Sequence, residues 1–187
     1  MGGGESEIDI HPETIPGLLM WLDAQDSSMV ISEGERVTFW LDKSGQGNSA
    51  IQVDRSKRPA YGLYSPTQLP LLQFDGEDDF LNFPEQQGVR TLFWVGFESP
   101  LASDNFRPMI GHDRFFDFHR GDDQSLFAFK HTVPINEGAT RIDGHAVDPW
   151  KTRFPAGLSL LEVESSKRLR ANLLASDRHL VDRTWLG

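Results

Sequence analysis

The sequence predicts an all-β protein, built as an antiparallel β-sandwich or barrel. Apolar residues recur with a period of two, which is the signature of strands. Residues typical of turns separate these runs, and eleven prolines scattered through the chain disfavour long helices. Thirteen phenylalanines and five tryptophans can fill a core between two sheets.

The first two strands are expected at residues 17–22 and 37–41. Residues 17–22 are apolar on both faces, which suits a strand that is covered on both sides. Residues 37–41 alternate, so Val37, Phe39 and Leu41 are expected to share one face.

Two further strands and one hairpin are expected later in the chain. Residues 91–97 and residues 114–119 both alternate with a period of two. The pair Asp143-Gly144 separates two short apolar runs. It predicts a two-residue hairpin, because both central positions of a type I′ turn need a positive φ.

The stretch FWLDKSGQGNSAIQ contains an acidic, glycine-rich loop at residues 42–48. Such a loop can be a phosphate cradle, a metal site, a glycan-binding rim or only a corner between two strands. A phosphate cradle needs a lysine after the second glycine and a following helix, and neither is present. We favour the corner, in which Asp42 and Ser44 bond their own turn and Gly45 or Gly47 supplies a positive φ.

Composition limits the class of partner. The chain has 187 residues, a formal net charge of -10 and no cysteine. This excess of acidic groups disfavours nucleic acid as a partner, and the absence of cysteine excludes disulfides and thiolate metal sites. No apolar run reaches the roughly 20 residues of a membrane span, so we expect no membrane insertion. One domain at residues 16–187 is expected after an acidic, glycine-rich lead-in at residues 1–15.

Four motifs in order, GLLMWLDAQDSS, VTFWLDKSGQGNSAIQ, LPLLQFDGEDDFLNF and TLFWVGF, resemble the opening of LamG-like jelly-roll domains. These belong to the concanavalin A-like lectin and glucanase superfamily. The later pieces FFDFHRGDD, TRIDGHAVD, NLLASDR and TWLG fit the same pattern more loosely. The resemblance implies an antiparallel jelly-roll β-sandwich. It also implies a non-catalytic binding or structural module of a larger extracytoplasmic or cell-surface protein, with a glycan or a protein as its ligand.

Domains of this kind continue past the W-x-G element into one more strand, which pairs beside the first strand. Here the W-x-G element is Trp185-Leu186-Gly187. The resemblance therefore implies an incomplete sheet edge. It predicts a second function, that of an assembly subunit completed by a strand from another chain or segment. The residues expected at this strand-pairing edge are Leu18, Leu19, Met20, Trp21 and Leu22.

Four residues are candidates for ligand binding: Asp117, His119, Arg120 and Trp150. Asp117 and His119 are two positions apart in an expected strand, so they share a face and offer two possible metal ligands. The alternative is a solvent-exposed polar face on which His119 and Arg120 form ion pairs with nearby aspartates. Trp150 follows Asp-Pro in a loop and can serve as an aromatic platform for a sugar, or else cover the edge of the core.

Calcium is the ion that the turns suit best, because it takes six to eight oxygen ligands from carboxylates and loop carbonyls. Two acidic turns supply such oxygens, although neither has the spacing of a helix-loop-helix calcium site. The candidate calcium ligands are Asp75, Asp78, Asp79, Asp122 and Asp123.

Glycan hydrolysis is a third possible function, and it has the weakest support. Retaining glycosidases place two carboxylates about 5 to 5.5 Å apart, and the jelly-roll glucanases carry them as E-x-D-x-x-E. The closest pattern here is Glu162-Val163-Glu164, which lacks the third member. We therefore expect no catalytic residues.

Overall fold

A computed structural model describes residues 11–102, 106–121, 125–179 and 184–187. In these residues the chain is nearly all β, with ten strands in one antiparallel sheet, consistent with a β-sandwich. The predicted all-β class is confirmed. The sheet order is β5-β4-β2-β3-β6-β10-β8-β9, with β1 paired to β2 and β7 paired to β10. The strands are β1 (Val30–Glu33), β2 (Arg36–Trp40), β3 (Ala50–Ile51), β4 (Ala60–Tyr64), β5 (Leu69–Gln73), β6 (Leu81–Gly96), β7 (Ile110–Gly111), β8 (Ala139–Ile142), β9 (His145–Ala146) and β10 (Ser159–Leu174).

In the part of the chain that the structure describes, helical structure is limited to single turns. The helix α1 (Val133–Asn136) precedes β8, and 3-10 turns form at Pro12–Thr14, Ser27–Met29 and Arg55–Lys57. Of the predicted lead-in, residues 1–10 lie outside the described chain. Pro12–Thr14 form an ordered turn, and the ring of His11 contacts Trp21 at 5.6 Å between ring centroids.

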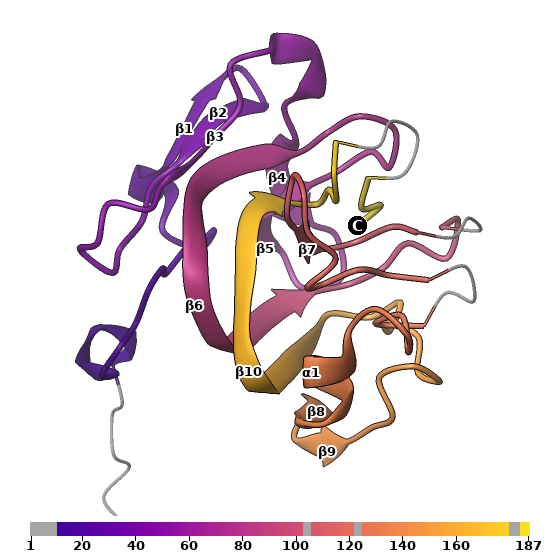
Figure 1. The fold of residues 1–187 in the computed structure, drawn as a ribbon. Helices are drawn as coiled ribbons and strands as arrows, with labels where there is room; N and C mark the ends of the chain where they lie inside the picture. The colour runs from indigo at the N-terminus through magenta and orange to yellow at the C-terminus, as the bar shows by residue number, and fades with distance from the viewer. Residues whose placement is uncertain (1–10, 103–105, 122–124, 180–183) are drawn as a thin grey trace, which may run out of the picture.

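The two longest strands, β6 and β10, lie side by side and curve together around the core (Figure 1). Their register shifts three times, first between Glu164 and Leu169. Extra residues at such shifts bend a strand and increase its twist. The bends let one continuous sheet fold over on itself, so that β1–β3 lie on one side of the molecule and β8, β9 and α1 on the other (Figure 1).

Alternate side chains of these strands fill the core. Leu161 and Val163 of β10 are buried, and Leu92 and Trp94 of β6 pack against the core. Their β6 neighbours point outward; Phe93, for example, is 60% exposed. The predicted alternation in residues 91–97 is therefore confirmed.

A β-bulge makes the prediction for residues 37–41 partly wrong. Ile31 of β1 pairs with Phe39, whereas the next residue, Ser32, pairs with Val37, so Thr38 has no opposite partner. The extra residue reverses the faces beyond it. Val37 is consequently buried, but Phe39 lies on the outer face.

The glycine-rich loop at residues 42–48 is a corner, as predicted. The Asp42 carboxylate accepts hydrogen bonds from the backbone amides of Ser44 and Asn48, each at 2.9 Å. Gly45 and Gly47 both have a positive φ. The Asp143-Gly144 hairpin is also confirmed, because these two residues have positive φ and connect the paired strands β8 and β9.

Residues 17–22 do not form the predicted strand. They run beside the corner loop, where the Lys43 amide donates to the Trp21 carbonyl at 2.8 Å and Asn48 Nδ2 donates to the Leu19 carbonyl at 2.7 Å. Met20 and Leu22 pack against the core on the other side. A loop, rather than a second strand, thus covers the outer side of this apolar segment.

The C-terminal segment pairs at a different place from the expected one. Leu186 forms a β-bridge with Asp75, and Gly187 exchanges two backbone hydrogen bonds with Phe74, directly after β5. The expected strand-pairing edge at residues 17–22 is therefore not the edge next to which residues 185–187 lie.

Candidate functional site

Backbone strain is concentrated around one histidine. Non-glycine residues with positive φ are rare and mark either turns or functional positions. Gln68 and Asp143 adopt this conformation in hairpin turns of the described chain. Phe106 also has a positive φ, and its ring stacks on His119 at 5.9 Å. The remaining examples follow β10 and flank Asp177, the hydrogen-bond partner of His119, in the chain. They are Ala175, Arg178 and His179.

His119 is held by a buried carboxylate. Its Nδ1 lies 2.8 Å from Oδ2 of Asp177, and the two residues are 7% and 3% exposed. A carboxylate can only accept, so this shorter contact places the proton on Nδ1, and the 3.2 Å contact of the same atom with Arg178 Nη2 is then not a hydrogen bond. In the neutral ring the lone pair is then on Nε2, which has no hydrogen-bond partner among the described residues. The arrangement orients His119 as a base or as a ligand.

Gly111 allows Asp177 to approach. A Cβ atom at this β7 position would lie 2.3 Å from the Ser176 carbonyl oxygen and 2.9 Å from the Asp177 Cα atom. Only glycine leaves room for the backbone after β10 to pass this closely. The close approach places the Asp177 side chain against His119.

Aromatic and cationic groups extend from this pair to the surface. The guanidinium of Arg178 lies 3.1 Å from Asp177 and 4.1 Å from the ring centroid of Phe116. Phe116 is 40% exposed and stacks on His131 at 5.3 Å. His131 in turn meets the edge of His119 at 5.3 Å.

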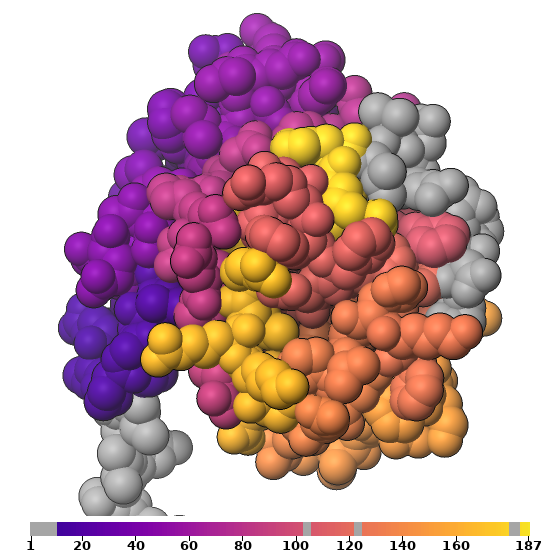
Figure 2. All heavy atoms as spheres, in the orientation of Figure 1, coloured from indigo at the N-terminus to yellow at the C-terminus, as the bar shows by residue number. Residues whose placement is uncertain are grey.

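Phe129, in the same turn as His131, forms a second aromatic pair with Trp150. Phe129 is 59% exposed, and its ring contacts Trp150 at 5.1 Å. Lys151 lies over the other ring of this pair, 5.8 Å from the centroid of Trp150. In Figure 2 the coral part of the chain lies beside the yellow C-terminal segment, and the orange part lies beside the coral part. We call the following set the aromatic–histidine surface: Phe116, His119, Phe129, His131, Trp150, Asp177 and Arg178.

The sequence-based candidates do not form one site. Residues 114–119 are not a strand, and a turn at Asp117 separates its side chain from that of His119. The Asp117 carboxylate instead accepts from the Arg170 amide at 2.7 Å. The prediction that Asp117 and His119 share a face is therefore wrong. Trp150 contacts Phe129, two residues before His131, and the ring of His131 contacts His119.

Arg120 points into the protein rather than toward a ligand. Its side chain is 2% exposed and forms an ion pair with Glu98 through two pairs of atoms, one of them 3.0 Å apart. It also donates to the carbonyl oxygens of Ser125 and Arg107. These contacts give Arg120 a structural role, and they correct its expected role in ligand binding.

The first acidic turn gathers three of the predicted calcium ligands. Carboxylate oxygens of Asp75, Asp78 and Asp79 lie within 4.8 Å of one another. Burial and the Asp75 carboxylate raise the pKa of Asp79 to about 7, although Arg36 lies 3.5 Å away. Oδ1 of Asp75 already accepts from the backbone amides of Glu77, Asp78 and Asp79. Much of its bonding capacity is thus used within the turn. Asp122 and Asp123 lie outside the described residues.

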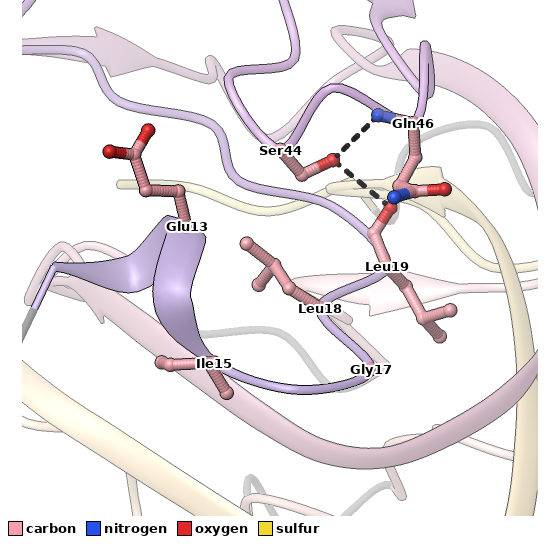
Figure 3. Close-up of a pocket in the computed structure, with 7 residues that line it drawn as sticks. All are labelled: Glu13, Ile15, Gly17, Leu18, Leu19, Ser44 and Gln46. Carbon is pink, nitrogen blue, oxygen red and sulfur yellow. Dashed lines mark hydrogen bonds between the residues drawn. The ribbon is translucent and has the colours of Figure 1, made fainter.

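A hollow lies beside the expected strand-pairing edge. It has a volume of about 260 Å³ and opens between the first 3-10 turn and the corner loop (Figure 3). Leu18 and Leu19 form one side and Ser44 and Gln46 the other. Ser44 Oγ accepts from the Gln46 amide, so this hydrogen bond lies within the corner loop (Figure 3). The hollow holds no titratable pair comparable to His119 and Asp177.

The sequence-based predictions did not include Asp177, Arg178 or His131 in the site. His131 is twelve residues from His119 in the chain, and Asp177 is 58 residues away. One local signal was available: the polar run Ser176 to His179 directly follows an apolar strand. Residues at the end of a strand often contribute to sites, but no periodicity shows where such a run points.

The chain is thus an all-β protein with a candidate site around the buried His119. Comparison of the chain with protein family models, curated proteins and solved structures found no match in any of the three. The helical turns of the described chain fall far short of the length and apolarity that a bilayer crossing demands.

Proposed function

We propose that this chain is a non-catalytic module that binds a carbohydrate ligand through the aromatic–histidine surface. The observation that carries the proposal is the convergence of strained backbone and buried support on exposed aromatic side chains. Strain of this kind costs about 1 to 3 kcal/mol per residue and persists where the surrounding structure enforces it. Phe106, which has such a backbone, stacks on His119, and Ala175, Arg178 and His179 flank Asp177 in the chain.

The chemistry of the surface suits a sugar. Sugar rings have apolar faces that pack on aromatic rings and hydroxyl groups that need hydrogen-bond partners. Phe129 and Trp150 offer the aromatic contact, and His119, His131 and Arg178 offer polar atoms. Because Asp177 holds both His119 and Arg178, little side-chain freedom is lost when a ligand binds. By its resemblance to LamG-like domains, we place the module in a larger extracytoplasmic protein.

A glycan array, followed by calorimetric titration of the sugars that bind, tests the proposal. We expect Phe129→Ala and Trp150→Ala each to weaken binding at least tenfold, because each removes one half of the exposed aromatic pair. Phe93→Ala is the matched control, since Phe93 is 60% exposed on the outer face of β6. A ligand whose affinity falls equally in all three variants, or an array without any binding, would contradict the proposal.

A second candidate function, assembly by strand pairing, is favoured by the free edge of β5. Tyr61 of β4 donates its amide to the Glu35 carbonyl at 2.7 Å, so its backbone groups point away from β5. Leu72 is paired with Tyr61, and in an antiparallel ladder such a pair exchanges no hydrogen bonds. The amide and carbonyl of Leu72 therefore face the same edge as those of Phe74, two residues further on.

The C-terminal segment covers one end of this edge, at Phe74 and Asp75. Gly187 exchanges both backbone hydrogen bonds with Phe74, and the described chain contains no backbone partner for Leu72 on that side. Pro70 is next on the same edge, where its missing amide proton is tolerated. We propose that an extended strand, supplied by another chain or segment, pairs antiparallel to β5 in register with Gly187.

Hydrogen exchange tests whether the edge accepts a strand. We expect the Leu72 amide to exchange quickly in the chain as it stands. A segment of five alternating valines and threonines added after Gly187 should slow this exchange at least tenfold and raise the melting temperature. The matched control is a glycine-serine extension of equal length. A Leu72 amide that is already protected, or equal behaviour of both extensions, would argue against a free edge.

A further inference from the structure

The Nε2 atom of His119 has the environment of a metal ligand. Histidines that bind metals almost always donate their other ring N–H to a carboxylate or a carbonyl group. In His119 this partner is Asp177, 3% exposed and 2.8 Å from Nδ1. Nε2 has no hydrogen-bond partner among the described residues. The bond to Asp177 therefore leaves the lone pair of the neutral ring on Nε2.

His131 lies where a second ligand is needed. The centroids of the two rings are 5.3 Å apart, and the ring planes are nearly perpendicular, at 85°. Two imidazoles bound to one tetrahedral ion at about 2.05 Å from the metal have their ring centroids roughly 5 Å apart. His131 is exposed, and neither of its ring nitrogens is bonded within the described chain. A rotation of this exposed ring can turn a nitrogen toward the point that Nε2 of His119 faces.

The charges nearby permit a cation. The guanidinium of Arg178 lies 3.2 Å from Nδ1 of His119, and its charge is paired with the Asp177 carboxylate at 3.1 Å. Imidazole nitrogens favour zinc, copper or nickel, whereas calcium and magnesium prefer oxygen ligands. The chemistry of the pair thus selects a divalent transition metal, and it differs from that of the acidic turn at residues 75–79.

We propose that His119 and His131 bind one divalent transition-metal ion, with Asp177 as the group that orients His119. The remaining coordination positions face the surface and are open to water or to an oxygen atom of a ligand. The site goes beyond the proposed carbohydrate binding and does not depend on it, because metal binding is measured without any sugar.

Copper is the probe for the number of histidines. Cu²⁺ is added to the chelator-treated chain, and the electron paramagnetic resonance spectrum reports the nitrogen atoms bound to the ion. We expect two imidazole nitrogens in the wild type and one in His131→Gln. Calorimetric titration with Zn²⁺ should show at least a tenfold loss of affinity in His119→Gln and in His131→Gln. His145→Gln is the matched control, because His145 is also exposed but lies in β9.

Asp177→Asn tests the orienting role. An amide can donate to Nδ1, which moves the ring proton to Nε2 and removes the lone pair from the metal-binding side. Loss of such an outer partner typically weakens metal binding 10- to 100-fold, and we expect a loss in this range. A circular dichroism spectrum equal to that of the wild type shows that this variant is folded. If it does not fold, the copper spectrum of His131→Gln decides alone. A single imidazole in the wild type, or an equal loss of zinc affinity in His145→Gln, would overturn the proposal.

Discussion

Replacing Arg120 by leucine is expected to lower the free energy of unfolding by about 4 kcal/mol. The guanidinium is 2% exposed and its partner, the Glu98 carboxylate, is 11% exposed. Removing the cation leaves a carboxylate in a site from which water is largely excluded. It also leaves the carbonyl oxygens of Ser125 and Arg107 without this donor. Urea unfolding followed by tryptophan fluorescence measures the loss.

The double variant Arg120→Leu/Glu98→Leu separates the cost of an unpaired charge from the cost of lost packing. Because replacing a whole buried ion pair by apolar groups is often nearly neutral, we expect it to recover at least half of the loss. An exposed ion pair gives the matched comparison: Lys151→Leu removes the partner of Asp148, which is 54% exposed, and should change stability by less than about 1 kcal/mol. A loss as small in Arg120→Leu would contradict the structural role and restore Arg120 as a candidate ligand-binding residue.

Replacing Asp42 by alanine is expected to lower the free energy of unfolding by about 2 to 3 kcal/mol. This carboxylate accepts from the Trp21, Ser44 and Asn48 amides and from the Ser44 hydroxyl, at 2.7 to 2.9 Å. It therefore holds the corner loop closed and connects it to residues 17–22. Hydrogen bonds to a charged group are worth more than neutral ones, and the partial exposure of this loop reduces the sum.

The same carboxylate predicts a dependence on pH. Burial raises the pKa of Asp42, but the bonds from Trp21, Ser44 and Asn48 outweigh it and hold the pKa below its usual 3.8. A depressed folded-state pKa contributes stability above pH 3.8, and this contribution is lost as the pH falls through the folded-state value. Asp42→Ala should therefore lose less stability than the wild type on acidification below pH 4.

Asp54 provides the control for Asp42. It accepts from the amide and the hydroxyl of Ser56, but it is an exposed cap of a 3-10 turn, and its carboxylate accepts no hydrogen bond from a distant segment of the described chain. We expect Asp54→Ala to cost clearly less than Asp42→Ala. Equal losses in thermal unfolding would show that the long-range bond to the Trp21 amide contributes nothing.

Local patterns determined much of this fold. The alternation in residues 91–97 and the hairpin at Asp143-Gly144 were predictable because each depends on residues within one strand or one turn. The corner at residues 42–48 was predictable for the same reason, since short polar side chains and glycines encode their own turn. Such features need no knowledge of distant neighbours.

Longer-range features depended on the tertiary structure. The bulge in β2 reverses the face of Phe39, and an extra residue on one strand is visible only when its partner strand is known. Residues 17–22 are apolar on both sides, which fits a buried strand and equally fits a segment between the core and a loop. Hydrophobic residues indicate that a segment is buried, but they do not identify the element that covers it.

The candidate site shows the same division. Sequence reasoning selected His119 and Trp150, because side-chain chemistry is a property of single residues. It paired His119 with Asp117, since two positions along a strand share a face, but the chain turns there and Asp117 bonds Arg170 instead. The actual partner, Asp177, reaches His119 only because β7 and β10 are paired and Gly111 leaves room for the backbone. That contact joins residues far apart in the chain, and packing in three dimensions alone decides it.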